Sequence, residues 1–228
     1  SLVPDDFCVM SVDGSHIDVD RHIPIRCYLI NLGGCVLNYG QSHDAYLFSE
    51  PSLPTTEREL YLQDTGSESR FHEQPLEGAL LGLKRTVEEA NALARLVKHK
   101  APPDKPVLAL LDGSLILWQL GGGQQNQYPD FVRRAFLQDG IVEALETIRN
   151  ISERSRIAVA SYISLPNARD VVNLLRLALC DYSSFGDCSR YCRTISPGDR
   201  HCDTVHFLTD RDLFAHLLAP GERSTLFY

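Results

Sequence analysis

The sequence predicts a mixed α/β fold, and three observations support this prediction. Three strand-like runs stand together near the start of the chain. Helix-like and strand-like segments alternate after them, which favours strands and helices packed in layers. Two apolar, β-branched runs, "CVMSVDGS" (8–15) and "VLALLDGSL" (107–115), end in the same Asp-Gly-Ser tripeptide. The simple explanation is a chance repeat of a common turn, and the alternative is that both tripeptides serve one site.

The first half of the chain is expected to hold three strands and one long helix. The strand-like runs are separated by turns that contain Gly, Asn and His. A polar stretch follows and is expected to be a loop with at most a short strand. In the long helix, apolar residues recur at spacings of three and four and form one apolar face. The expected elements are strands at Phe7–Val12, Ile23–Leu37 and Ala45–Glu50, and a helix at about Pro75–Lys100.

The second half is expected to alternate between strands and helices. Its first strand is a continuous apolar run, as in the middle of a sheet, and "GGGQQNQ" after it is expected to be a flexible link. The expected elements are strands at Val107–Leu117 and Ile157–Ile163, and helices at Phe131–Ile151 and Ala168–Cys180. The order β-β-β-α-β-α-β-α is typical of a ribonuclease-H-like mixed sheet with helices packed on it. In that arrangement a carboxylate at the centre of the first strand lies next to one at the end of the fourth.

Length and composition indicate a globular protein. The 228 residues are 43% hydrophobic and 23% charged, and we expect one domain over residues 1–228 with a loop-rich, cysteine-containing insertion at 181–205. We expect this chain to be a segment of a longer protein, because a strand pattern begins at residue 7 and "GERSTLFY" ends in an apolar cluster. No apolar run is long enough for a membrane span. Seven cysteines, an odd number, favour reduced thiols and a cytoplasmic location.

The two Asp-Gly-Ser tripeptides predict a divalent metal site. Asp13 and Asp112 follow apolar strands, and converging carboxylates are the hard oxygen ligands that Mg²⁺ and Mn²⁺ prefer. The glycine after each aspartate allows the backbone to approach a ligand closely. Ser15 and Ser114 come next, and their hydroxyls are predicted to bind a substrate phosphate or to orient the carboxylate.

A third metal ligand is expected from the helix that precedes the second aspartate. The segment "KRTVEEANAL" places Glu88 and Glu89 there, well off the apolar face and on opposite sides of it. Helical geometry therefore does not choose between the two glutamates. The alternative for each is a solvated surface residue.

Five segments, in order and over nearly the whole chain, resemble the NurA nuclease family. They are "SVDGS", "LKRTVEEANALA", "LALLDGSLI", "IAVASYISLPNARDVVNLLRLALC" and "FLTDRDLFAHLLAPGERSTLF". The resemblance implies a single NurA-like nuclease domain with a ribonuclease-H-like core. Carried over by motif, Asp13, Glu88 and Asp112 would be the catalytic metal ligands, and Glu88 follows from alignment of an R-x-x-E pattern.

The resemblance also implies an activity and partners. We expect a Mn²⁺-dependent DNA nuclease, with Mg²⁺ as the alternative ion, that acts 5′ to 3′ on DNA ends and cuts single strands. It would act in DNA end processing and double-strand break repair, as a homodimer, with a HerA-type hexameric ATPase. The family also uses a histidine in a segment beyond "GERS", which this chain does not reach. His201, His206 and His216 do not match that motif.

Two other functions remain open at this point. The first is a non-catalytic docking module of the same fold, which dimerises and binds the ATPase. The second is an actin-like sugar kinase or ATPase, because that fold begins with similar strands and an Asp-Gly turn. A kinase would need a glycine-rich phosphate loop at a helix N-terminus, whereas "GGG" at 121–123 precedes a glutamine-rich link.

Several other residues are candidates for binding. Arginines that could contact phosphates are the first group, with Arg169 predicted to bind substrate and a solvated helix face as the alternative. Trp118 and Tyr128 flank the glycine-rich link, where an aromatic ring could stack on a base or pack at the edge of the core. Four cysteines could hold a metal, although their spacing is not a paired Cys-x-x-Cys pattern. The arginines are Arg133, Arg134, Arg169 and Arg176, and the cysteines are Cys180, Cys188, Cys192 and Cys202.

Overall fold

The computed structural model describes most of the chain as two compact units, Ser1–Ile163 and Ser164–Tyr228. The predicted single domain over residues 1–228 stays a prediction. No helix among the described residues is long and apolar enough to cross a membrane. The residues that the structure describes are 4–18, 26–41, 43–64, 73–120, 128–153, 155–181, 188–192, 195–196 and 198–225.

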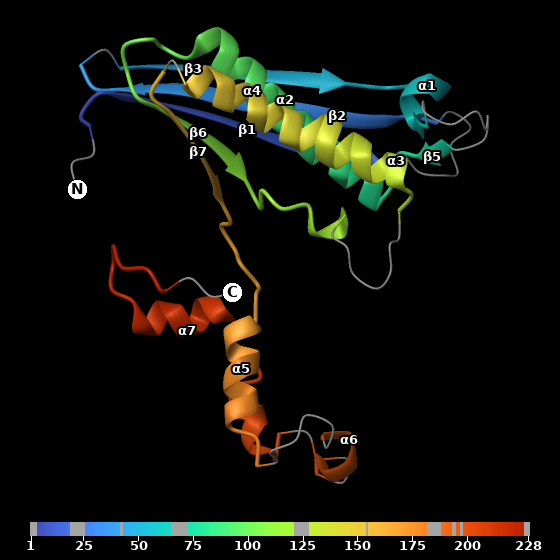
Figure 1. The fold of residues 1–228 in the computed structure, drawn as a ribbon, viewed down its shortest axis with the longest axis vertical. Helices are drawn as coiled ribbons and strands as arrows, with labels where there is room; N and C mark the ends of the chain where they lie inside the picture. The colour runs from blue at the N-terminus through green and yellow to red at the C-terminus, as the bar shows by residue number, and fades with distance from the viewer. Residues whose placement is uncertain are drawn as a thin grey trace. The chain divides into compact units, whose positions relative to one another are not determined.

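The first unit is built on a five-stranded mixed sheet (Figure 1). Its strands are β1 (Phe7–Asp18), β2 (Tyr28–Tyr39), β3 (Asp44–Ser52), β6 (Val107–Asp112) and β7 (Ile157–Tyr162), in the order β3-β2-β1-β6-β7. β2 is antiparallel to β1 and β3, whereas β6 is parallel to both β1 and β7. Three antiparallel strands joined to two parallel ones confirm the predicted mixed α/β, ribonuclease-H-like sheet.

The two Asp-Gly-Ser tripeptides differ in local structure. β1 does not end at Val12 as predicted but continues through its tripeptide to Asp18, because β2 supplies a partner at every position, including Gly33 opposite Asp13. β6 ends at Asp112, before the predicted Leu117. Gly113 then turns the chain with a φ of +84°, a conformation that glycine adopts at little cost. Only the second tripeptide is therefore a turn.

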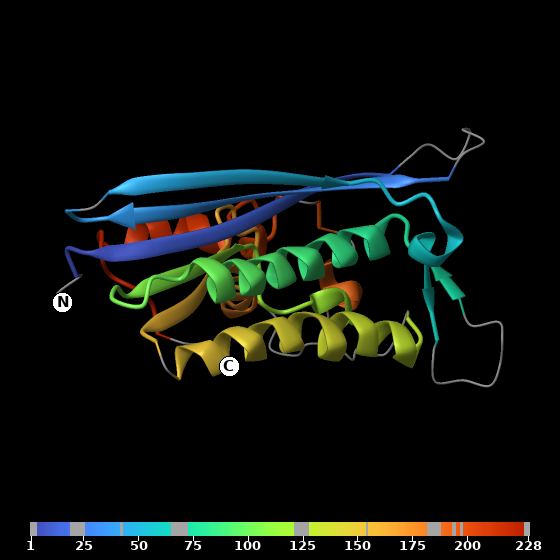
Figure 2. The same cartoon turned by 90° about the horizontal axis from the view of Figure 1, so that it is seen from above.

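Two long helices cover one face of the sheet (Figure 2). α2 (Ala79–Lys100) contacts β1, β2 and β6, and its buried leucines, valines and alanines pack on the inward residues of these strands. The second helix is continuous through α3 (Asp130–Arg133), the π-helical segment η2 (Arg134–Val142) and α4 (Glu143–Ser152). It packs against α2, and its α4 part also contacts β7. Both helices match the predicted segments to within a few residues.

The stretch between β3 and α2 contains more structure than predicted. It forms α1 (Glu57–Leu60), β4 (Tyr61–Gln63) and β5 (Glu73–Pro75), where a loop with at most a short strand was expected. A capping box starts α1, in which Thr56 and Glu59 satisfy each other's backbone N–H groups. β5 pairs with β4, so the long helix begins after Pro75 rather than at it. The predicted glycine-rich link at 121–127 lies outside the described residues.

The second unit contains α5 (Asp170–Ala178), α6 (Cys188–Tyr191), η4 (His201–Asp203) and α7 (Asp210–Leu217). α7 is tied to the start of α5, because the Asp210 carboxylate accepts hydrogen bonds from two backbone N–H groups there, at 2.9 and 3.2 Å. These bonds fill donors that a helix N-terminus leaves unpaired. These hydrogen bonds therefore help to hold the two helices together.

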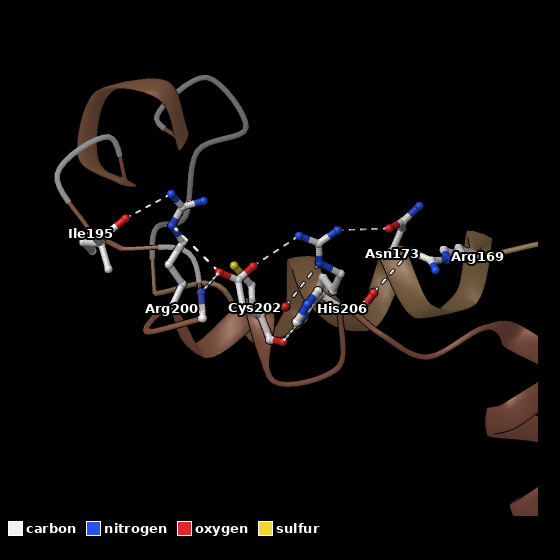
Figure 3. Close-up of polar contacts among 9 residues, drawn as sticks. Arg169, Asn173, Ile195, Arg200, Cys202 and His206 are labelled. Atoms are coloured by element: carbon white, nitrogen blue, oxygen red, sulfur yellow. Dashed lines mark hydrogen bonds and ion pairs between the residues drawn. The ribbon is translucent and has the colours of Figure 1, made fainter.

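Asp203 lies in the predicted cysteine-containing insertion, between the labelled Cys202 and His206 in sequence, and contacts several of its described residues (Figure 3). Its carboxylate accepts a hydrogen bond from the Gly198 backbone at 3.1 Å and lies 3.4 Å from the Arg176 guanidinium. The Gly198 hydrogen bond is the main reason why the pKa of Asp203 lies below its usual value. No group of three or more His, Cys, Asp or Glu in the described part of the chain is arranged to hold a metal ion. Cys180 and Cys202 are free thiols, Cys192 is buried, and the Cys188 side chain lies outside the described residues.

Candidate active site

Asp13 and Asp112 lie side by side on the sheet. Val12 and Leu111 are paired in the parallel register of β1 and β6, and each aspartate directly follows one of them. Neighbouring strands are about 4.8 Å apart, and residues at the same register position face the same side of a sheet. Both aspartates are exposed and line one cavity of about 360 Å³. This position agrees with the predicted pairing of the two tripeptides.

The third carboxylate in this cavity is Glu89, which α2 presents from the side. Glu89 is 4% exposed, and it reaches β1 because Gly14 has no side chain. A Cβ atom at Gly14 would lie 2.7 Å from Oε1 of Glu89. The glycine of the first tripeptide therefore makes room for the glutamate, a role that concerns close packing rather than a turn.

Glu88, which the resemblance favoured as a ligand, faces elsewhere. It forms an ion pair with Lys84 at 3.1 Å and lines a separate cavity with Tyr28 and Glu59. Consecutive helical residues differ by about 100° in direction, so only one of the two glutamates can face the aspartates. The structure places Glu89, and not Glu88, in that position.

The electrostatic environment of Glu89 disfavours its charge. The pKa of Glu89 is raised to about 7, mainly by burial and also by the nearby Asp13 and Asp112 carboxylates. The Arg85 guanidinium and a hydrogen bond from the Gly14 backbone act in the opposite direction. A buried carboxylate beside two others is stabilised by any cation that enters the cavity.

Arg85 supplies that positive charge in this structure. Its Nη1 donates hydrogen bonds to Oε1 of Glu89 at 2.8 Å and to the Gly14 carbonyl at 2.7 Å. Its Nε is buried without a hydrogen-bond partner. Sequence reasoning missed Arg85, although its i,i+4 spacing to Glu89 is the usual signal for such a pair.

The set of oxygen donors around the cavity suits a hard divalent cation. Three carboxylates from β1, α2 and β6 provide oxygen ligands around a cavity that is open to solvent. As the side chains stand, no three acidic or histidine groups in the described residues converge closely enough to hold an ion. One oxygen of Glu89 is instead bound to Arg85. A metal would therefore have to compete with Arg85 for this carboxylate.

The predicted substrate-binding residues lie in different places. Ser114 lines the cavity, and its Oγ accepts a hydrogen bond from the Ile116 backbone at 3.0 Å, which holds the turn after Asp112. Ser15 is exposed on β1 and is not among the described residues that line this cavity. Arg169 belongs to the second unit, where its Nη1 donates to the His206 carbonyl at 3.2 Å (Figure 3).

The other three candidate arginines have partners within the chain. Arg133 donates to the Leu120 carbonyl and lies 3.7 Å from the Asp130 carboxylate. Arg134 pairs with an aspartate at 3.4 Å, and Arg176 contacts Asp203 as described above. The Arg134 pair is exposed, as expected of the solvated helix face that was the alternative to phosphate binding.

Comparisons with known proteins identify the family of the chain. The family model of the NurA domain matches residues 8–228. Among solved structures, LC9-RNase H1, a type 1 RNase H with the type 2 active-site motif, is 13% identical, with 77% of this chain and 72% of that chain covered and a TM-score of 0.33. A crystal structure of NurA with manganese is also 13% identical, with 77% of this chain and 39% of that chain covered and a TM-score of 0.27. The search of curated proteins found no match. Because the family match spans nearly the whole sequence, the chain belongs to the NurA domain family.

Proposed function

We propose that this chain is a metal-dependent DNA nuclease that hydrolyses phosphodiester bonds. The observation that carries the proposal is the single cavity lined by Asp13, Glu89 and Asp112, with Glu89 buried and its pKa raised. Bringing carboxylates from three separate elements together costs free energy, because their charges repel each other. A bound cation would offset this cost. Membership of the NurA domain family supports the same reaction class.

The three carboxylates have distinct roles in this proposal. Asp13 and Asp112 are exposed and would bind a divalent cation, Mn²⁺ or Mg²⁺, from the solvent side. Glu89 would complete the set from the buried side, with Arg85 released from it. The bound cation would lower the pKa of a water molecule and offset the charge that develops on the phosphate. Gly14 keeps the path between α2 and β1 open for Glu89.

The finer activity is proposed on the family resemblance. The protein would digest DNA 5′ to 3′ from its ends and cut single strands, in DNA end processing and double-strand break repair. It would work as a homodimer with a HerA-type hexameric ATPase. The net charge of −8 indicates modest affinity for DNA on its own. The ATPase would then supply most of the affinity for DNA.

The test is digestion of labelled single- and double-stranded DNA with Mn²⁺ by the full chain. Asp13→Asn and Asp112→Asn keep the side-chain shape but remove the charge, and we expect each to lower the rate at least ~10²-fold. Asp139→Asn, at an exposed ion pair with Arg134, is the matched control and should cut normally. Circular dichroism checks that each variant folds. If folded Asp112→Asn cuts as fast as wild type, the proposed site is wrong.

A second candidate is the non-catalytic docking module. It is favoured by one observation, the Arg85 guanidinium that already binds Glu89 where a metal would be needed. Under this alternative the wild-type protein would dimerise and bind a HerA-type ATPase but release no nucleotides with Mn²⁺ or Mg²⁺. Measurement of cleavage with and without the ATPase separates the two functions.

A further inference from the structure

We propose that Trp118 is a stacking platform for a base of single-stranded DNA at the rim of the acidic cavity. The inference rests on the proposed function, because it assigns the residue that holds the strand beside the carboxylates. Trp118 is the only tryptophan in the sequence. It lines the same cavity as Asp13, Glu89 and Asp112, and it is 71% exposed.

Trp118 is exposed although the segment that carries it is anchored to the core. Trp118 begins the short 3-10 helix η1 (Trp118–Leu120), which is held by the buried Leu117 and Leu120, 7% and 3% exposed. Within this segment the Trp118 N–H donates to the Ile116 carbonyl at 3.0 Å, and the Leu120 N–H donates to the Leu117 carbonyl at 2.9 Å. Arg133 on the neighbouring helix donates to the Leu120 carbonyl at 3.3 Å. The backbone beneath the ring is therefore fixed from both sides.

A large exposed aromatic ring on a fixed backbone suggests binding. Tryptophan offers a large apolar face, and most proteins bury such a face when packing allows it. Tyr128, on the other side of the glycine-rich link, does pack against the core. Ile116, 56% exposed, also lines the cavity and extends the apolar surface next to the indole. An apolar rim beside three carboxylates matches a ligand with flat apolar groups as well as anionic groups.

A base of single-stranded DNA has this chemistry. Its face can stack on an indole whatever the sequence, whereas the bases of a duplex already stack on each other. The adjacent phosphate would then lie toward the carboxylates, where the proposed cation would hold it. Stacking does not depend on charge, so it works in a protein of net charge −8 that attracts the phosphate backbone poorly. Single strands and frayed ends are thus the substrates that Trp118 selects.

The single tryptophan makes the proposal directly testable. Because Trp118 is the only indole, tryptophan fluorescence of the full chain reports on this residue alone. The protein is titrated with oligothymidylate in the presence of a metal chelator, so that no cleavage occurs, and binding is followed in parallel by anisotropy of labelled DNA. We expect saturable quenching by the single strand and none by a blunt duplex of the same length. Oligothymidylate that binds without quenching, or fails to bind at all, would overturn the proposal.

Variants give an independent readout. We expect Trp118→Ala to weaken binding of oligothymidylate about 5- to 150-fold, in line with the loss of one stacked base. Trp118→Phe should retain most of the affinity, because phenylalanine keeps a stacking face. Tyr46→Ala removes another exposed aromatic ring, 49% exposed on β3 and outside this cavity, and should bind like wild type. Equal affinity for wild type and folded Trp118→Ala would contradict the stacking role. If that variant does not fold, the quenching of the wild-type fluorescence still tests the proposal.

The outcome is distinct from that of the nuclease test. Binding is measured without metal, so a protein that quenches and binds but never cuts would support the stacking site and reject the proposed function. A protein that cuts with Mn²⁺ while Trp118→Ala binds as tightly as wild type would support the function and reject the stacking site.

Discussion

Oε1 of Glu89 lies against the space that a side chain on Gly14 would occupy, 2.7 Å from an ideal Cβ position. This close approach joins the middle of β1 to the middle of α2 at the one point where the candidate site needs a carboxylate from the helix. Cγ of Arg85 would lie 3.1 Å from the same Cβ. The absence of a side chain at residue 14 therefore determines the positions of both members of the Arg85–Glu89 ion pair.

Gly14→Ala is expected to displace Glu89 and destabilise the protein. The added methyl group would force the side chains of Arg85 and Glu89 to move, and overpacking of this kind costs about 1–3 kcal/mol. The free energy of unfolding, measured by urea denaturation, gives the loss. Gly33→Ala is the matched control, because Gly33 pairs with Asp13 on the next strand and its nearest neighbour would be 3.8 Å away. Equal stability of the two variants would show that Gly14 has no packing role.

Glu89→Gln is expected to abolish stabilisation by Mn²⁺, and Glu88→Gln to retain it. At an ion concentration about 100 times Kd, binding stabilises a folded protein by about 2.7 kcal/mol. For a chain of this size the corresponding rise in Tm is about 5–10 °C. Thermal melts of wild type and both variants, with Mn²⁺ and with a chelator, measure this shift. The reverse result, a shift lost only in Glu88→Gln, would favour the ligand that the sequence resemblance indicated.

Arg85→Met is expected to destabilise the metal-free protein more than Lys84→Met does. Both changes break an i,i+4 ion pair on α2, but the side chain of Glu89 is 5% exposed whereas the side chain of Glu88 is 35% exposed. A buried acceptor that loses its partner costs about 1–3 kcal/mol, and an exposed pair contributes less than about 1 kcal/mol. Urea denaturation at pH 8 with a chelator provides the comparison. If the Arg85→Met loss persists undiminished in a Glu89→Gln background, the ion pair is not its cause.

The metal-free protein is expected to become less stable as the pH rises from about 4.5 to about 7. The first value is the ordinary pKa of a glutamate and the second is the pKa of Glu89 in the folded protein. Between them the folded state holds a proton that the unfolded state has released, so each step up in pH favours unfolding. Glu89 contributes up to roughly 3 kcal/mol to the free energy of unfolding below this pH range, and this contribution is lost above it.

Unfolding free energies across this pH range, measured with a chelator present, test the prediction. Glu89→Gln carries no titrating group at this position and should lose that part of the slope, whereas Glu88→Gln should keep it. A slope that is identical in wild type and Glu89→Gln would mean that another group titrates.

Much of the fold was predictable because it depends on local pattern. The apolar runs gave the five strands of the sheet, and the three-and-four spacing gave α2, whose apolar face packs on the sheet as expected. Elements that lack such a pattern, such as β4 and β5, were missed, because short strands become stable only when each finds the other.

The pairing of Asp13 and Asp112 was also predictable from the sequence by itself. Both residues directly follow an apolar run, and the ribonuclease-H-like arrangement inferred from the order of elements places those strands next to each other, as they are found. The register of a sheet then brings the two residues together whatever the details of the helices above it. Local pattern, strand order and the ribonuclease-H-like arrangement that they indicated were sufficient for this part of the site.

Only the tertiary structure decided between Glu88 and Glu89. The helical period places the two side chains on opposite flanks of the apolar face, and nothing in the local sequence says which flank lies over β1. That depends on how α2 crosses the sheet, which is determined by packing of its buried residues and by ties such as the hydrogen bond from the Gly78 N–H to Asp18, at 2.8 Å. The crossing brings Glu89 over Gly14, the one residue of the Asp-Gly-Ser tripeptide that can accept it without a clash. Contacts between elements far apart in the chain, and not the pattern within either one, therefore select the third carboxylate.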